Sequence, residues 1–192
     1  MASAPIQKSY LTAEEYLVLE RQAETKSEYI DGEMVAMTGG TSEHSLVTMN
    51  VGGLLWQQLR QGSCRVYTGD LRVRILAADV YYYPDLSVVC GEPCFEEGNR
   101  DNLLNPILIV EVLSPSTESY DRGGKFQNYQ TLQSLQEYVL VSQNQPRVEH
   151  FLRQDGHVWL YTDVSGLDNT ASLSSIGCQL PLADIYARVE FP

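Results

Sequence analysis

One carboxylate stands inside the most apolar segment of the chain, and it constrains the fold more than any other residue. The segment is Ile107-Leu108-Ile109-Val110-Glu111-Val112-Leu113, a near-continuous apolar run typical of a strand covered on both faces. An unpaired, ionised carboxylate buried in such a strand costs several kcal/mol even after relaxation. Glu111 therefore requires a metal ion, a nearby lysine or another buried ion pair, unless it lies at a strand end where it reaches water.

The hydrophobic periodicity around this strand predicts an α+β (mixed α/β) chain with a sheet at its centre. Helices are expected over about 12–24, over about 42–61, and from 116 or 117 to about 133. The first of them begins with a capping box formed by Thr12 and Glu15. Asp31-Gly32 lies between apolar runs, and this pattern predicts a β-hairpin over 29–35.

The remaining segments read as strands. They are expected over 71–75, 86–90, 107–113, 138–141, 148–152 and 158–162, the last two forming an antiparallel C-terminal part. In the first of them Arg72 and Arg74 alternate with apolar residues, which indicates a strand with one solvent-exposed face.

Length and composition indicate one globular domain. The chain has 192 residues, of which 43% are hydrophobic and 20% charged, values that separate it from disordered chains. No linker or repeat divides it, so the domain is expected to span 1–192. Thirteen basic residues against 25 acidic ones give a net charge of −12, which argues against a protein that coats nucleic acid with a broad basic surface.

The chain is expected to be a reduced, soluble, cytoplasmic protein with no membrane segment. No apolar run approaches the roughly 18 residues of a membrane span, and residues 1–5 lack the pattern of a signal peptide. The cysteines are too scattered for a disulfide scaffold. Cys90 and Cys94 could supply two zinc ligands, but no second Cys or His pair follows them.

Asp85 is the second carboxylate of interest. It follows Pro84, and because proline lacks an N–H it belongs at the start or edge of a strand. Pro-Asp is also a common turn dipeptide. Two acids on neighbouring strands can share a divalent cation, so Asp85 and Glu111 together form a candidate metal site.

Lys125 is the only lysine outside the N-terminal region, since the others are Lys8 and Lys26. It shares a predicted helix face with Asp121 and Tyr129, each four residues away. If this face turns toward the strand ends, the ammonium can meet Glu111 or a phosphate. The alternative is a lysine on an ordinary solvated surface.

Glu28 and His44 are weaker candidates. Glu28 enters the predicted hairpin and is either a third acid or an exposed side chain. His44 lies in the first turn of a helix, where the helix dipole disfavours the protonated form; it is either a neutral proton acceptor or metal ligand, or a surface residue. Asp70 is a weaker candidate still, and the sequence indicates no partner for His150 or His157. Motifs for nucleotide binding, serine hydrolysis or zinc proteolysis are missing.

Several of these residues occur together in a recognisable order. The blocks are Glu28-Tyr29-Ile30-Asp31-Gly32-Glu33, His44, Pro84-Asp85-Leu86, Ile109-Val110-Glu111-Val112-Leu113-Ser114-Pro115-Ser116-Thr117, and Asp121 through Lys125 to Tyr129. From about Thr12 to Ile185, the chain resembles the Uma-type putative restriction endonuclease family, which is numerous in cyanobacteria and is placed in the PD-(D/E)XK nuclease superfamily.

The resemblance implies a restriction-endonuclease-like core, in which helices flank a central mixed sheet, with an extra antiparallel C-terminal part. Asp85 would be the first acid of the motif and Glu111 the second. The superfamily lysine normally follows the second acid by two residues, where this chain has Leu113, so Lys125 would supply the ammonium from the next helix. Ser142 stands where the family often has an acid.

The resemblance also implies ligands and partners. Asp85, Glu111 and the backbone carbonyl of Val112 would hold Mg²⁺ or Mn²⁺, and Lys125 would orient or activate a water molecule. Glu28 and His44 would be accessory. Possible phosphate contacts are Arg72, Arg74 and Arg122. The partners would be DNA and a second copy of the chain, in a homodimer.

Three functions follow as hypotheses. The first is a magnesium-dependent endonuclease that hydrolyses DNA phosphodiester bonds, although a charge of −12 weakens nonspecific DNA binding. The second is a non-catalytic DNA-binding or regulatory module with the nuclease fold; the presence of Asp85, Glu111 and Lys125 argues against it. The third is a metal-dependent hydrolase of a small phosphorylated or nucleotide substrate, which a narrow, closed pocket would favour.

Overall fold

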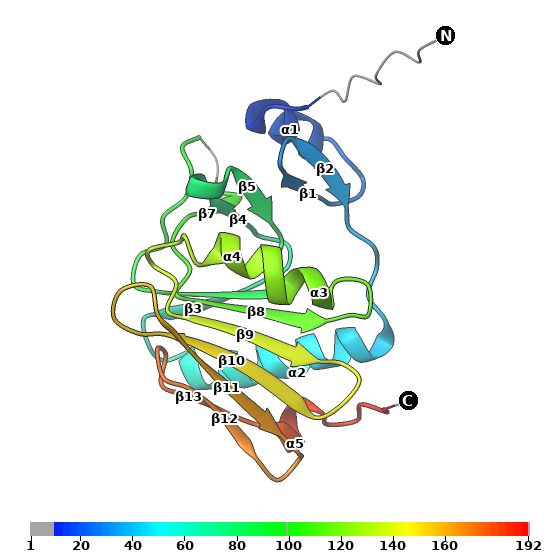
Figure 1. The fold of residues 1–192 in the computed structure, drawn as a ribbon, viewed down its shortest axis with the longest axis vertical. Coiled ribbons are helices and arrows are strands. Elements are labelled where there is room, and N and C mark those ends of the chain that lie inside the picture. Colours follow the sequence, from blue (N-terminus) through cyan, green and yellow to red (C-terminus); the bar gives the residue numbers. More distant parts are fainter. Residues whose placement is uncertain (1–9, 99, 192) are drawn as a thin grey trace.

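The computed structural model describes residues 10–98 and 100–191 (Figure 1). Residues 1–5, which are expected to lack a signal peptide, and Lys8 lie outside these ranges. Among the described residues, none of the helices has the length and apolar character needed to cross a membrane.

The centre of the molecule is a mixed six-stranded sheet in the order β11-β10-β9-β8-β6-β3. Its strands are β3 (Cys64–Thr68), β6 (Leu86–Cys90), β8 (Leu108–Leu113), β9 (Glu137–Ser142), β10 (Arg147–Arg153) and β11 (Trp159–Ser165). β8 and β9 run parallel and the other neighbours are antiparallel. All six residues of β8 are buried, as the apolar run predicts.

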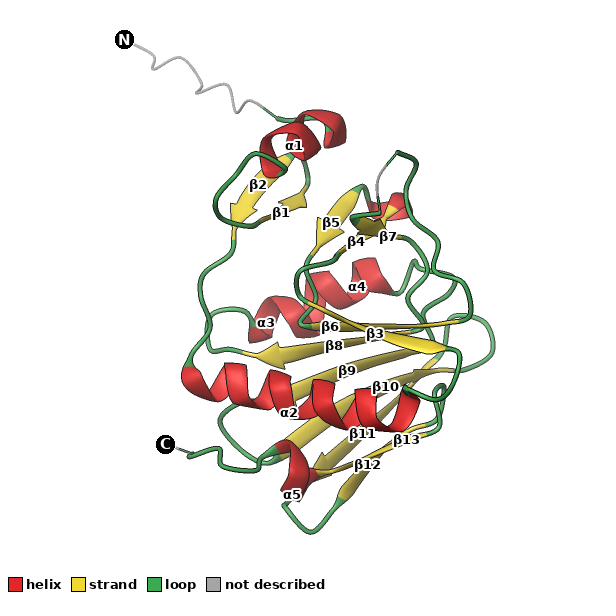
Figure 2. Cartoon of the chain, turned by 180° about the vertical axis from the view of Figure 1, so that it is seen from behind, coloured by secondary structure: helices red, strands yellow, loops and turns green. Residues whose placement is uncertain are grey.

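Helices cover both faces of this sheet (Figures 1 and 2). On one face lie α2 (Ser42–Leu59), the β12 (Thr170–Leu173) and β13 (Cys178–Pro181) hairpin and α5 (Leu182–Ile185). On the other lie α3 (Glu118–Tyr120), the π-helical turn η2 (Asp121–Lys125) and α4 (Phe126–Tyr129). Side chains of β8 alternate between the two: Val110 and Val112 pack toward α2, whereas Ile109 and Leu113 pack toward α4. Glu111 lies on the α4 side.

A smaller five-stranded sheet lies above the central one, in the order β2-β1-β5-β4-β7. It consists of β1 (Ser27–Ile30), β2 (Glu33–Ala36), β4 (Arg72–Ile75), β5 (Val80–Tyr82) and β7 (Asn102–Leu103), with η1 (Leu76–Ala78) between β4 and β5. The predicted hairpin is confirmed: Ile30 pairs with Glu33, and Asp31 and Gly32 both have positive φ. Helix α1 (Ala13–Glu20) begins with the expected capping box.

Two predicted helices are shorter or less regular than expected. α1 ends at Glu20 rather than near 24, because the buried Glu20 carboxylate accepts the backbone N–H of Ser27, where β1 begins. The predicted helix over 116–133 is divided into α3, η2 and α4. Its wider π-helical turn places Gly124 against the ring of Tyr120, where an added Cβ would lie 2.8 Å from ring carbon Cε2.

The expectation of a solvent-exposed arginine face on β4 is wrong. All four residues of this strand are buried, including Arg72 and Arg74. Arg72 pairs with Asp101 and lies over the Tyr83 ring, and Arg74 pairs with Asp79. These partners lie elsewhere in the chain, so alternation within the strand cannot reveal them.

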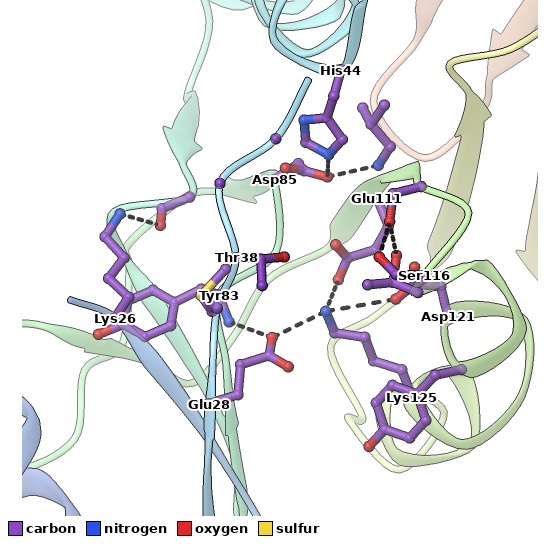
Figure 3. A pocket seen from close by; sticks show the side chains of 18 of the residues that line it. Lys26, Glu28, Thr38, His44, Tyr83, Asp85, Glu111, Ser116, Asp121 and Lys125 are labelled. Carbon is purple, nitrogen blue, oxygen red and sulfur yellow. Dashed lines mark hydrogen bonds and ion pairs between the residues drawn. The ribbon is translucent and has the colours of Figure 1, made fainter. Parts of the chain in front are cut away.

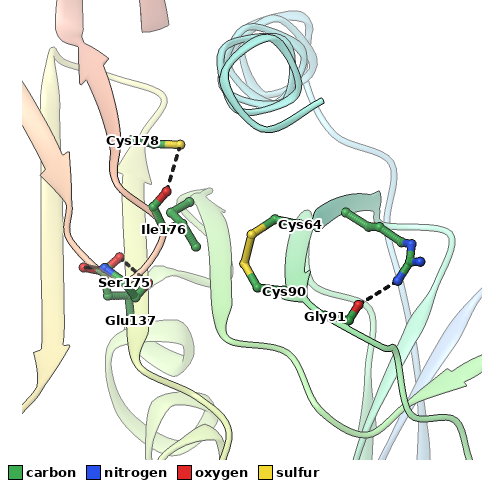
Figure 4. Close-up of a disulfide and its surroundings, with 8 residues drawn as sticks. Cys64, Cys90, Gly91, Glu137, Ser175, Ile176 and Cys178 are labelled. Atoms are coloured by element: carbon green, nitrogen blue, oxygen red, sulfur yellow. Dashed lines mark hydrogen bonds between the residues drawn. A yellow bond between two sulfur atoms is a disulfide. The ribbon is translucent and has the colours of Figure 1, made fainter. Parts of the chain in front are cut away.

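The expectation that the cysteines are all reduced is also wrong. Cys64 and Cys90 form a disulfide between β3 and β6 (Figure 4). The antiparallel register places these two residues directly opposite each other, a relation that their spacing of 26 residues does not reveal. Cys90 is therefore not available as a zinc ligand together with Cys94, which is exposed.

This bridge predicts a redox-dependent stability. A disulfide that closes a loop of 26 residues should stabilise the folded chain by about 3 kcal/mol. Reductant is therefore expected to lower the free energy of unfolding by about that amount in urea denaturation. The Cys64→Ser/Cys90→Ser variant should show the lower stability without reductant and no further change with it; an unchanged stability in that variant would contradict the prediction.

Candidate active site

Asp85, which immediately precedes β6, lies next to Glu111 of the neighbouring strand β8. The register pairs Leu86 with Val110, so that Asp85, one residue earlier, lies across from Glu111. An oxygen of the Asp85 carboxylate, Oδ2, accepts the backbone N–H of Val112 at 2.7 Å. The two acids thus stand on neighbouring strands, as the sequence predicts.

Lys125 reaches these strands from η2. Its Nζ lies 3.0 Å from Glu111 Oε1, 3.1 Å from Glu28 Oε1 and 3.8 Å from Asp121 Oδ1 (Figure 3). Only 8% of the Lys125 side chain is exposed, so the lysine is not a solvated surface residue. Tyr129, one turn further along the predicted face, donates its hydroxyl to Glu111 Oε1 at 3.2 Å.

The carboxylates and the ammonium set one another's ionisation. Burial raises the pKa of Glu111 well above its usual value, Lys125 opposes this rise, and Asp121, Asp85 and Glu28 add to it. Burial alone would lower the pKa of Lys125, but its three carboxylate neighbours raise it well above the usual value. Lys125 thus favours its charged form and is surrounded by more acidic side chains than basic ones.

Glu28 belongs to this group rather than to the surface. It lies in β1, is buried, and accepts the backbone N–H of Tyr83 at 3.2 Å in addition to its ion pair with Lys125. Since β1 belongs to the smaller sheet, Glu28 joins that sheet to the helical segment beside the central one.

His44 contacts Asp85 from the first turn of α2. Its Nε2 lies 3.4 Å from Asp85 Oδ2. The hydrogen bond with Asp85 raises the pKa of His44, against the effect of burial. The direction of this shift is opposite to the one expected from the helix dipole, because a full carboxylate charge at this distance outweighs the partial charge at a helix N-terminus.

The structure places the three arginines that were predicted to contact phosphate outside the lining of this site. Arg72 and Arg74 are buried in their ion pairs within the smaller sheet. Arg122 pairs with Glu118 and Glu149, each at 2.8 Å. The described residues that line the cavity at the site include none of the three.

A cavity of about 720 Å³ opens above the acids. Its walls come from the end of β2 and the loop before α2, from the loop around Asp70, and from the turn 114–117 after β8. Lys26 lines it as well, where it pairs with Asp70 and donates to the Gly69 carbonyl at 3.0 Å. Sequence reasoning gave Lys26 no role, because nothing in its local pattern points to the cavity.

The other two histidines lie outside the cavity lining. His150 is buried on β10, with Nε2 3.2 Å from Glu137 Oε1, a partner that the sequence did not reveal. His157 is exposed in the turn before β11.

The donor set around Asp85 fits a hard divalent cation. Asp85, Glu111 and the backbone of Val112 offer oxygen ligands, which Mg²⁺ and Mn²⁺ prefer. In the described part of the chain no group of three or more His, Cys, Asp or Glu side chains is arranged to hold a metal ion. Two carboxylates and a carbonyl would therefore leave positions for water and phosphate, which is how Mg²⁺ is commonly bound.

The buried ion pair predicts strong coupling between Lys125 and Glu111. Lys125→Met should lower the free energy of unfolding by about 3–5 kcal/mol, because it leaves buried carboxylates without a counter-charge. Lys125→Met/Glu111→Gln should recover more than about 1 kcal/mol of this loss. Urea denaturation measures both. Lys26→Met, which breaks an exposed pair, is the control and should cost less than about 1 kcal/mol; equal losses in the two lysine variants would refute the coupling.

Comparison with known proteins places the chain in a family. The family described as Uma2, putative restriction endonuclease, matches residues 13–183. Two uncharacterized proteins of Synechocystis sp. are 38% identical over 156 residues (81% of this chain and 88% of the relative) and 37% identical over 189 residues (98% and 97%).

A solved structure agrees on the fold. The crystal structure of a putative nuclease belonging to DUF820 from Anabaena variabilis superposes with a TM-score of 0.76 at 20% identity, over 94% of this chain and 99% of that one. At this identity the match supports the restriction-endonuclease-like fold alone. Together with the matched residues 13–183, the relatives show that the chain belongs to the Uma2 family of putative restriction endonucleases.

Proposed function

We propose that this protein is a Mg²⁺- or Mn²⁺-dependent endonuclease that hydrolyses DNA phosphodiester bonds through a site of the PD-(D/E)XK type. Its membership of a nuclease family supports the general class. The observation that carries the proposal is the arrangement at the strand ends. There Asp85 lies across from Glu111, with the Lys125 ammonium 3.0 Å from Glu111.

Asp85, Glu111 and the Val112 carbonyl would hold the ion. When bound, it would supply a Lewis acid that stabilises charge developing on the phosphate and lowers the pKa of a bound water. The Val112 N–H fixes one oxygen of Asp85, and Lys125 and Tyr129 both hold Glu111 Oε1. Each carboxylate would thus bind with its remaining oxygen.

Lys125 takes the place of the lysine that the motif normally carries two residues after the second acid. Leu113 occupies that position and is buried in the cluster that includes Phe126. Residues i and i+2 of a strand share a face, so a lysine there would extend from the face on which Lys125 already lies. The ammonium opposes the rise that burial causes in the pKa of Glu111, and it would orient the attacking water.

Glu28 and His44 act as positioning residues in this proposal. Glu28 forms a second ion pair with Lys125 besides that of Glu111, and His44 Nε2 faces Asp85 Oδ2. Lys26, which lines the cavity, replaces the three arginines as the expected contact to phosphate.

One observation favours a second candidate function. A cavity of about 720 Å³ is of the size that holds a small ligand, so a metal-dependent hydrolase of a nucleotide or small phosphorylated substrate is the alternative. The non-catalytic module has no comparable support, since the ionic group is complete. Homodimer formation stays a prediction from the resemblance, and a cytoplasmic location stays a prediction from the sequence.

Metal binding tests the site directly. Wild-type protein is expected to bind Mn²⁺ in calorimetric titration, and Asp85→Asn and Glu111→Gln to bind it at least about 100-fold more weakly, because each removes a charged ligand. Both variants should also lose cleavage of DNA. Asp70→Asn, which removes a carboxylate that lines the same cavity, is the matched control and should retain binding. Wild-type cleavage rates in either ligand variant would refute the mechanism.

A further inference from the structure

We propose that the cavity takes an unpaired strand of DNA, such as a free end or a flap, rather than continuous duplex, and that Tyr120 is the platform on which one of its bases stacks. This inference rests on the proposed nuclease function and names its substrate class. Three independent features of the site support it: the depth of the reactive groups, the charge of the cavity lining, and the fixed aromatic ring at its wall.

The reactive groups lie deep in the cavity. Exposed fractions of the side chains are 6% for Glu111 and 8% for Lys125, and reach only 22% for Asp85. Duplex DNA is stiff, with a persistence length of about 150 base pairs, so its phosphates reach a recessed floor only if the duplex is locally opened. An unpaired strand bends at each nucleotide and can enter without that cost.

The charge of the lining opposes a duplex. Proteins that bind duplex DNA neutralise several phosphates with lysine and arginine. Among the described residues, the lysines and arginines that line the cavity are Lys26 and Lys125. The carboxylates that line it are Glu28, Asp70, Asp85, Glu111 and Asp121. This balance suits the few phosphates that lie close to a bound metal ion, and not the long row of phosphates along a duplex.

Tyr120 supplies a fixed ring at the wall of the cavity. Its hydroxyl lies 2.8 Å from that of Tyr82, which also accepts the Asn128 side-chain N–H at 2.6 Å. Its ring rests against Gly124, where no Cβ fits. The residue nevertheless stays 36% exposed. The ring is thus held by its hydroxyl and, along one edge, by Gly124. It needs no reordering before a base stacks on it, and such stacking contributes about 1–3 kcal/mol.

Neutral donors line the same cavity as this ring. In the turn that connects β8 with α3, the Ser114 hydroxyl lies 3.0 Å from that of Ser116 and 2.9 Å from that of Thr117. Hydroxyls of this kind contact phosphate oxygens without reading the base sequence. Glu111 in β8, these hydroxyls in the turn and Tyr120 in α3 therefore follow one another along the chain, and all of them line the cavity.

The test compares substrates and variants of the full chain in Mn²⁺. The substrates are a single-stranded oligonucleotide, the same sequence as a blunt duplex, and that duplex with a single-stranded flap. We expect the single strand and the flap to be cleaved at least about tenfold faster than the blunt duplex. Tyr120→Ala should raise KM for the single strand about tenfold with a smaller change in kcat.

Two variants separate stacking from folding. Tyr120→Phe keeps the ring and loses only the hydroxyl, so it should retain most of the wild-type KM. Tyr161→Ala removes an exposed tyrosine on β11, outside the cavity lining, and should leave cleavage unchanged. Circular dichroism checks that each variant is folded.

The outcomes distinguish this inference from the proposed function. Equal or faster cleavage of the blunt duplex overturns the inference and leaves the nuclease intact. A Tyr120→Ala variant with wild-type KM, or a Tyr120→Phe variant as weak as Tyr120→Ala, overturns the stacking platform. Mn²⁺ binding without cleavage of any of the three substrates overturns both the inference and the DNA nuclease, and favours the small-substrate hydrolase.

Discussion

The buried ion pair between Glu111 and Lys125 joins the parts of this molecule. Glu111 lies in the central strand, Lys125 in the helical segment that covers one face of the sheet, and Glu28, which also contacts Lys125, in the smaller sheet. Because an ammonium buried at this depth is stable only with its carboxylates in contact, the three elements must dock together. The same contact that closes the fold therefore forms the floor of the cavity.

Acidic side chains outnumber basic ones around this pair. Glu28, Glu111 and Asp121 surround Lys125, and Asp85 lies next to them, so carboxylates outnumber the ammonium. Replacement by apolar residues of similar volume would commonly be neutral or stabilising. The divalent cation proposed above would offset the excess of buried acids, since anything that binds only the folded state adds to its stability.

The sequence predicts those features that depend on local pattern. The capping box at Thr12, the hairpin at Asp31-Gly32 and the need of Glu111 for a partner all follow from neighbouring residues. The predictions that are wrong depend on long-range contacts. The alternation around Arg72 indicates a solvent-exposed strand face, whereas in the fold Arg72 is buried and pairs with Asp101. His44 is judged from its helix end alone, while Asp85 decides its pKa.

In the proposed site the lysine departs from the usual position of the motif, and this departure shows why spacing is an incomplete guide to such a site. The strand position two residues after Glu111 is filled by Leu113, which packs into the core with Phe126. The π-helical turn that precedes Phe126 places Lys125 on the same face of β8. A lysine could therefore extend either from the strand position of Leu113 or from the turn. From either position its ammonium would supply the counter-charge that the buried Glu111 carboxylate needs. The electrostatics require only that the positive charge lies beside that carboxylate, whichever element carries it. The turn that holds Lys125 there also positions Tyr120 against Gly124 at the cavity wall.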